Sequence, residues 1–171
     1  MKKIALIIVL LCILVLGFIF FTTRSSKPSS PAVALPHSST QTITLYYYSS
    51  TLDQDESGNI LCSEKGLVGV KRKISDSKKI IDDTIRLLIK GQLTSDEKNQ
   101  GITTEFPLPN FEFIQSDLQD NILTITFKDP LFKTSGGACR VQILQQQIVA
   151  TAKQFNEVSQ VIFEPNDLFQ P

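Results

Sequence analysis

The clearest spacing of metal-ligand side chains lies in a polar loop at residues 53–64. Its pattern D-x-D-x-S-G, with Glu at the twelfth position, is typical of loops that bind calcium in EF-hand proteins. Gly58 would provide the sharp turn. The ligand oxygens would come from Asp53, Asp55, Ser57, Asn59 and Glu64. Strands rather than helices are expected on both sides of the loop, so a solvated acidic hairpin loop is the favoured interpretation and bound calcium the alternative.

Two cysteines, Cys62 and Cys139, are the only ones in the C-terminal 130 residues. In an oxidising compartment an even pair of this kind favours a disulfide bond. The bond would close a long loop and, on the chain-entropy model, contribute about 4 kcal/mol to stability. Two independent thiols are the alternative.

The segment at residues 135–140, Ser-Gly-Gly-Ala-Cys-Arg, leads directly into an expected helix. A reactive thiolate at the helix N-terminus, or an anion site backed by Arg140, would be its chemically active interpretations. A cysteine nucleophile needs a base, however, and the only histidine is His37, which precedes the expected domain. A glycine turn that carries a disulfide partner is therefore favoured.

No arrangement of residues is typical of an enzyme. The sequence has no P-loop, GxGxxG, HExxH, GxSxG or paired CxxC motif. Hydrolysis would have to use carboxylates alone, and Glu105, Glu112 and Asp129 are scattered along the chain. We therefore assign no catalytic, cofactor-binding or metal-binding residue, and only Cys62 and Cys139 as a structural pair.

Strands and helices alternate in the segments that must hold these loops. Two-residue alternation of apolar side chains predicts strands at 42–48, 67–74, 111–114, 122–127 and 159–163. In the first of them, three successive tyrosines at 46–48 cannot all point the same way, which indicates sheet packing rather than a ligand platform. Asp120 and Asn121 form a turn pair between the third and fourth strands.

Two amphipathic helices are expected between these strands. Asp76 would cap the first, at about 77–90, and Gly91 would end it. A capping box of Thr94 and Glu97 predicts a short helical turn. The second helix, at 141–155, has one apolar face, formed by Val141, Leu144, Ile148, Ala152 and Phe155. This order of elements predicts an α+β fold, with a mixed sheet of about five strands and both helices on one face.

Residues 4–21 form an uninterrupted apolar run without a charged residue or a proline. As a helix this run would span roughly 27 Å, enough for the hydrocarbon core of a bilayer. It ends in Phe-Ile-Phe-Phe, which is a poor site for signal peptidase. We expect an uncleaved single-pass anchor, with residues 1–3 as a cytoplasmic tail and the C-terminal domain outside the cytoplasm. A cleaved signal peptide, or a lipoprotein modified at Cys12, are the alternatives.

Residues 22–41 have the composition of a spacer. Twelve of these 20 residues are Ser, Thr or Pro, and none is acidic or aromatic. Four of the 17 basic residues precede residue 42, which leaves 13 basic and 17 acidic residues, a net charge of −4, in the domain at 42–171. This acidic balance argues against a nucleic-acid partner.

The domain has one basic patch, the run at 71–73 with Lys78 and Lys79 nearby. Contact with anionic lipid headgroups or acidic wall polymers is one interpretation. Three aspartates between residues 76 and 83 dilute the patch, which favours an ordinary solvated face.

Several segments together have the pattern of a known domain. They are ITLYYY at 43–48, LLIKG at 87–91, GITTEFP at 101–107, ILTITF at 122–127, GGACRVQILQQQIVATAKQF at 136–155 and VSQVIFEPND at 158–167. Their order resembles a single copy of the GerMN domain of bacterial sporulation and spore-germination proteins, which also occurs in envelope lipoproteins. The residues at matching positions are Gly101, Pro107, Gly136, Gly137, Thr151 and Phe155. The resemblance covers nearly all of residues 42–171.

The resemblance implies a non-catalytic envelope module that mediates assembly or ligand contact, often beside the peptidoglycan. Similar single-copy, membrane-tethered forms carry cysteines at the positions of Cys62 and Cys139, which favours the disulfide. The segment Asp167-Leu168-Phe169 departs from the usual closing Asn/Asp-Gly turn of the family. A role in sporulation itself therefore stays open.

We expect a protein attached to the cell membrane through residues 4–21, with no cofactor and no nucleic-acid partner. Its domain would contact peptidoglycan, other envelope proteins or a second copy of itself. Two alternatives belong to other classes. One is an envelope enzyme, such as a cell-wall hydrolase that uses carboxylates like Glu105 and Asp129. The other is a calcium-responsive domain built on the loop at 53–64.

Overall fold

The computed structural model describes residues 39–171. The expected cytoplasmic tail, the anchor at 4–21 and nearly all of the spacer lie outside the described residues. Among the helices of residues 39–171, none combines the length and the apolar character that crossing a bilayer requires.

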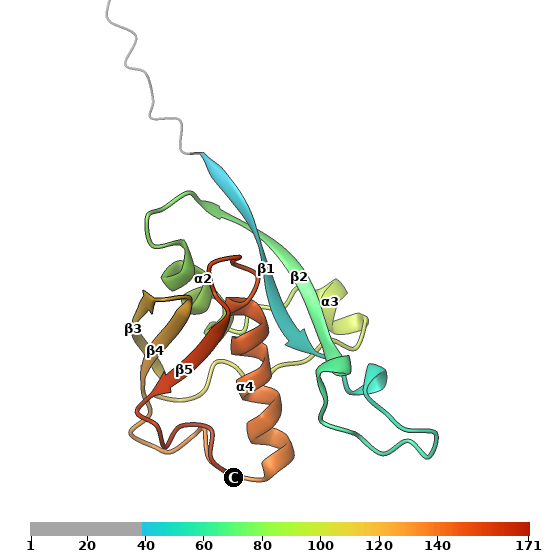
Figure 1. Ribbon diagram of the computed structural model, residues 1–171. Helices are drawn as coiled ribbons and strands as arrows, with labels where there is room; N and C mark the ends of the chain where they lie inside the picture. Colours follow the sequence, from blue (N-terminus) through green and yellow to red (C-terminus); the bar gives the residue numbers. More distant parts are fainter. Residues whose placement is uncertain (1–38) are drawn as a thin grey trace, which may run out of the picture. The chain divides into compact units, whose positions relative to one another are not determined.

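Strands β1 (Thr40–Tyr48) and β2 (Leu67–Ser75) form a long antiparallel ribbon, the first of two sheets (Figure 1). The register pairs the first residue of β1 with the last residue of β2. The alternation expected from the sequence is present, because Ile43, Leu45 and Tyr47 are buried on one face. Their burial attaches the ribbon to the core through a single face.

The outer edge of β1 is closed by side chains of helix α4 (Ala138–Ala152) and of the turn that follows it. The amide N of Thr44 donates to Oε1 of Gln154 (2.7 Å), and Nε2 of Gln154 donates to the carbonyl oxygen of Thr44 (2.8 Å). The amide N of Tyr46 donates to Oγ1 of Thr151 (3.0 Å). These bonds satisfy main-chain groups that an open strand edge would offer to another strand.

The second sheet has the order β3-β4-β5. Strands β3 (Glu112–Gln119) and β4 (Ile122–Lys128) are antiparallel, and β5 (Gln160–Glu164) runs parallel to β4. Asp120 and Asn121, with φ of 49° and 65°, form the predicted turn between β3 and β4.

Helix α2 (Ile80–Ile89) contacts β1, β3 and α4 and so connects the two sheets. The short helix α3 (Ser95–Asn99) has the capping box that the sequence predicts at Thr94 and Glu97. Buried residues from both sheets and from the helices α2 and α4 form one hydrophobic core. The described part of the chain thus has its own core.

The α+β class, the five strands and the two main helices agree with the sequence-based prediction, but the strands lie in two sheets rather than in one mixed sheet. The division has a physical cause at β1. Its second edge bonds to Thr151, Gln154 and Thr103 instead of to a third strand.

Helix α2 begins later than its predicted start at residue 77. Asp76 does not cap it, because its amide N donates to the carbonyl oxygen of Ser39 (2.8 Å) and its carboxylate accepts from the Ser39 hydroxyl (3.2 Å). The hydroxyl of Ser77 accepts a hydrogen bond from the amide N of Lys79. This bond forms a turn ahead of the helix. Asp76 therefore closes the end of the β1–β2 ribbon instead.

Helix α4 covers Ala138–Ala152, three residues earlier than predicted at each end. Its predicted apolar face is nevertheless buried, from Val141 to Phe155. Two of the three tyrosines, Tyr47 and Tyr48, are buried as expected for packing, while Tyr46 is partly exposed. Burial raises the pKa of Tyr47 to about 12.

The C-terminal segment packs back onto the core. Leu168 and Phe169 are only 6% and 4% exposed. The ring of Phe169 meets those of Phe111, Phe127 and Phe163 at centroid distances of 6.2, 6.4 and 4.8 Å. The segment that departs from the family's closing turn thus contributes two core side chains.

Gly91 ends α2 as predicted, with a φ of 61° and its amide N donating to the carbonyl oxygen of Leu88 (2.9 Å). A Cβ atom at this position would collide with the main-chain carbonyl of Phe106. Both the backbone conformation and the space therefore require glycine.

Replacing Gly91 by Ala is expected to lower the free energy of unfolding by about 2 kcal/mol or more, because left-handed strain and a backbone collision add. Gly58→Ala is the matched control, since Gly58 has a φ of 83° but nothing within 4 Å of the added Cβ. That control should lose only about 1 kcal/mol. Urea unfolding of residues 39–171 measures both, and equal losses would contradict the steric explanation.

Candidate functional site

The loop at 53–64 is held by its own carboxylates. Asp53 is 1% exposed and accepts from the Tyr48 hydroxyl (2.5 Å), from the amide N of Ser63 (2.6 Å) and from the Ser63 hydroxyl. Burial by itself raises the pKa of Asp53, but the bonds from Ser63 and Tyr48 outweigh burial and hold that pKa below its ordinary value. Burial and the bond to Asp53 raise the pKa of Tyr48.

The second carboxylate of this loop, Asp55, also accepts bonds from within the loop. Its oxygens accept hydrogen bonds from the amide N atoms of Ser57 and Asn59 (both 2.8 Å) and from Nδ2 of Asn59 (2.9 Å). Across residues 39–171, no three His, Cys, Asp or Glu side chains are arranged to hold a metal ion. The geometry of this loop is that of a hydrogen-bonded hairpin loop.

A disulfide bond joins Cys62 to Cys139 and so ties the loop to the first turn of α4. The two Cα atoms lie 5.3 Å apart, within the usual range for disulfides. Because Cys139 is bonded in this way, it is no free thiolate at the helix N-terminus.

Arg140 is engaged by the protein rather than open to an anion. Its Nε donates to Oε2 of Glu105 (2.7 Å), and its other nitrogens donate to the carbonyl oxygens of Ser135 (2.9 Å) and Lys133 (3.0 Å). Asp129 accepts the amide N of Lys133 (2.8 Å) and two bonds from the next residue. Glu105 and Asp129, two of the three carboxylates considered for hydrolysis, therefore each stabilise a loop, while Glu112 lies exposed at the start of β3.

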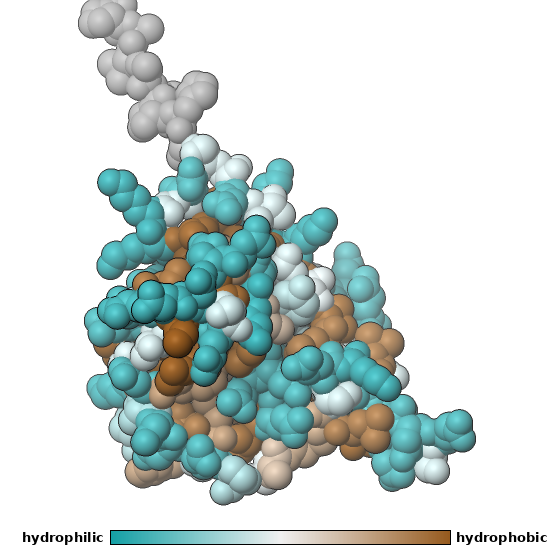
Figure 2. Space-filling model, in the orientation of Figure 1, coloured by the Kyte–Doolittle hydropathy of each residue, from teal (hydrophilic) through white to brown (hydrophobic). Residues whose placement is uncertain are grey.

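The loop, together with Leu52 directly before it, also carries exposed apolar side chains. Leu52, Ile60 and Leu61 are 61%, 49% and 48% exposed. Figure 2 shows brown surface beside the hydrophilic tip of this projecting part of the domain. The disulfide and Asp53 hold the backbone that presents these side chains.

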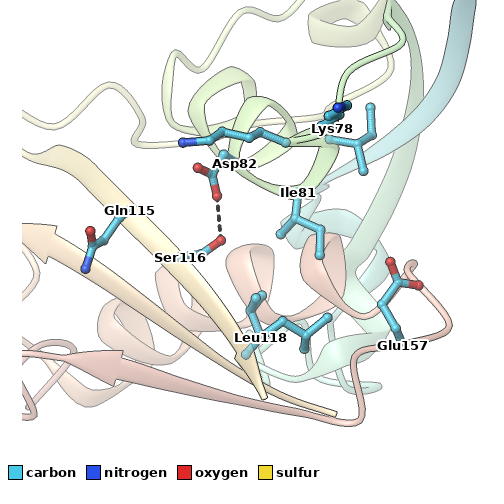
Figure 3. A pocket seen from close by; sticks show the side chains of 10 residues that line it. Lys78, Ile81, Asp82, Gln115, Ser116, Leu118 and Glu157 are labelled. Atoms are coloured by element: carbon cyan, nitrogen blue, oxygen red, sulfur yellow. Dashed lines mark hydrogen bonds between the residues drawn. The ribbon is translucent and has the colours of Figure 1, made fainter. Parts of the chain in front are cut away.

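A groove of about 410 Å³ lies between the start of α2 and the second sheet (Figure 3). Its apolar floor includes Ile80 and Ile81 from α2 and Leu118 from β3, all partly exposed. Ser116 and Gln115 of β3 line one side. The first turn of α2 thus faces the end of β3 across an accessible apolar surface.

The rim of this groove carries two cations and two anions: Lys78, Lys79, Asp82 and Glu157. Asp82 accepts from the hydroxyl of Ser116 (2.5 Å), which fixes it toward β3. Within residues 39–171 the ion pairs are Arg72–Glu97 and Arg140–Glu105, so the two lysines form none there.

Sequence reasoning did not predict this groove. It assigned Lys78 and Lys79 to a solvated basic patch. Ser116, Leu118 and Glu157 lie 27 or more positions beyond the end of α2, and no local pattern connects them to it. The adjacent apolar pair Ile80-Ile81 was the one available signal, since both side chains pack at the margin of the core and stay partly exposed.

The Arg72–Glu97 ion pair connects the ribbon to α3. Both guanidinium nitrogens of Arg72 lie 2.7 Å from carboxylate oxygens of Glu97, and one also donates to the carbonyl oxygen of Gln92 (3.0 Å). The bonds from Arg72, reinforced by those of the capping box with Thr94, lower the pKa of Glu97 to about 2.

Because the pKa of Glu97 is lower in the folded state than the ordinary value of 4.5, its contribution to stability is present above pH 4.5 and is lost as the pH falls toward 2. Glu97→Gln should remove this contribution, about 1 kcal/mol after allowance for solvent screening, and flatten stability between pH 4.5 and 2. Urea unfolding across this range measures the effect. Glu56→Gln, in the exposed loop, is the control, and an identical pH profile for the two variants would contradict the prediction.

The double variant Cys62→Ser/Cys139→Ser should lose between about 4 and 5 kcal/mol of stability, because the bridged cysteines lie 77 positions apart and close a long loop. Urea unfolding measures the loss by comparing three samples: the double variant, the oxidised native domain and the reduced native domain. A reduced native domain as stable as the oxidised one would contradict the prediction.

Limited proteolysis should cut the double variant first in the 53–64 loop, which the disulfide bond no longer holds.

Comparison with known proteins agrees with this fold. No curated protein matches the chain. The solved structure of the tandem GerMN domains of the sporulation protein GerM from Bacillus subtilis is similar, with a TM-score of 0.53 and 20% identity. The likeness covers 82% of this chain and 45% of that chain, and at this identity it shows the fold alone. Residues 44–167 match the family described as Germane, sporulation and spore germination. The chain therefore belongs to the Germane family and contains a GerMN domain.

Proposed function

We propose that this protein is a membrane-anchored GerMN domain that works outside the cytoplasm as a non-catalytic interaction module. The observation that carries the proposal is the Cys62–Cys139 disulfide, because such bonds persist in oxidising compartments and are rare in the cytosol. The uncharged run at 4–21 supports the same location, since it is long enough to anchor the domain in the cell membrane.

The proposed partners are peptidoglycan, other envelope proteins or a second copy of the chain. The loop with Leu52, Ile60 and Leu61 supports a contact role, because exposed apolar side chains on a rigid loop bind without a large ordering cost. Glu105 and Asp129 do not favour an enzyme, since both are bonded to neighbouring main-chain or guanidinium groups.

The test uses residues 39–171, which have their own core. We expect this domain to sediment with purified peptidoglycan or to self-associate in analytical ultracentrifugation. The double variant Ile60→Ser/Leu61→Ser should weaken that interaction about tenfold, because it removes apolar contact area.

Ile114→Ser/Ile162→Ser is the matched control, since Ile114 and Ile162 are 45% and 41% exposed but lie on the second sheet. It should bind as the native domain does. A domain that stays monomeric and binds no peptidoglycan would contradict the proposal, and so would clearing of cell-wall substrate in a zymogram.

A further inference from the structure

The geometry of the groove between α2 and β3 points to a ligand class: we propose that it binds short zwitterionic peptides with a free carboxylate and a free ammonium group. This inference deepens the interaction role proposed above and rests on it for the cellular source of the ligand, the peptide stems of the cell wall. The groove itself, and its chemistry, are observed independently of that role.

The groove has the size of a binding cleft, since its volume of about 410 Å³ lies in the usual range for small-ligand sites. Its lining is more polar than apolar, which suits a charged ligand rather than a purely apolar one. Ile80, Ile81 and Leu118 are partly exposed along its floor. A ligand over this floor would remove apolar surface from water.

The charges on the rim select the ligand. Lys78 and Lys79 are cationic, Asp82 and Glu157 are anionic, and their sum is zero. A polyanion would meet the two carboxylates, and a polycation would meet the two ammonium groups, so either would be repelled by half of the rim. A ligand that carries both charges can place each one against its opposite.

Lys78 and Glu157, one cation and one anion, lie apart on the rim (Figure 3). Figure 3 shows Ile81 between the side chains of Lys78 and Glu157, while Asp82 is turned toward Ser116 on β3. A peptide that crosses the floor would therefore direct its carboxylate to Lys78 and its ammonium group to Glu157. The carboxamide of Gln115 can donate to and accept from peptide groups in between.

Titration of ¹⁵N-labelled residues 39–171 with the pentapeptide L-Ala-γ-D-Glu-L-Lys-D-Ala-D-Ala, followed by NMR, tests the inference. Amide shifts should concentrate at residues 78–82, 115–118 and 157. The same peptide with both amines acetylated and both carboxylates amidated should bind at least about tenfold more weakly, because it has lost all of its charges. Shifts spread over the whole domain, or equal affinity for the blocked peptide, would overturn the inference.

Variants localise the effect. Lys78→Ala/Lys79→Ala should weaken binding about tenfold and Glu157→Gln about fivefold. Lys71→Ala/Lys73→Ala is the matched control, since it removes the same charge from the exposed face of β2 and should stay within about twofold of the native affinity. Native affinity in both groove variants would overturn the assignment, provided that their spectra remain folded.

Two further outcomes separate this inference from the proposed function. Pentapeptide binding without sedimentation on peptidoglycan would support the groove and contradict the wall contact. An unrelated zwitterionic pentapeptide that binds equally well would support the ligand class and remove the wall as its specific source.

Discussion

The hydrogen bonds between the outer edge of β1 and the end of α4 are the contact on which the rest of the domain depends. A two-stranded ribbon is barely stable alone, and β1 has one edge that no strand covers. Gln154 and Thr151 form hydrogen bonds to the main chain of that edge. The apolar face of α4, from Val141 to Ala152, is buried in the core. The ribbon, α4 and, through α2, the three-stranded sheet therefore share one core.

Two further constraints act on the projecting loop after β1. The Cys62–Cys139 bond connects it to α4, and the buried carboxylate of Asp53 connects its two arms through Tyr48 and Ser63. Both act at the base of the loop, which leaves its apolar side chains exposed. Asp53 and Asp55 have the spacing of metal ligands, but both accept hydrogen bonds from the protein itself. The carboxylate of Asp53 is buried, so it faces the protein rather than the solvent.

The groove depends on the same framework but on different parts of it. Its two walls come from α2 and from β3, and Arg86 of α2 bonds to the carbonyl oxygens of Phe113 and Ile114 on β3. The bond between Asp82 and Ser116 lies along the same contact. The separation of the walls is therefore determined by direct bonds between a helix and a strand that the sequence places far apart.

The sequence by itself determined the features that depend on neighbouring residues. The capping box at Thr94 and Glu97, the helix end at Gly91 and the β3–β4 turn were predicted because each rests on main-chain conformation within a few positions. The apolar face of α4 was predicted because helical spacing makes it visible. The resemblance to a known domain, carried by such turns and core positions, predicted the family.

Only the tertiary structure decided which distant groups meet. It divided the strands between two sheets, made Asp76 a partner of Ser39 rather than a helix cap, and buried the carboxylate of Asp53. It also assembled the groove from α2, β3 and the turn after α4. None of these has a local signature. A side chain such as that of Asp53 has the same sequence neighbours whether it faces solvent or the core, and the packing of remote elements selects between the two.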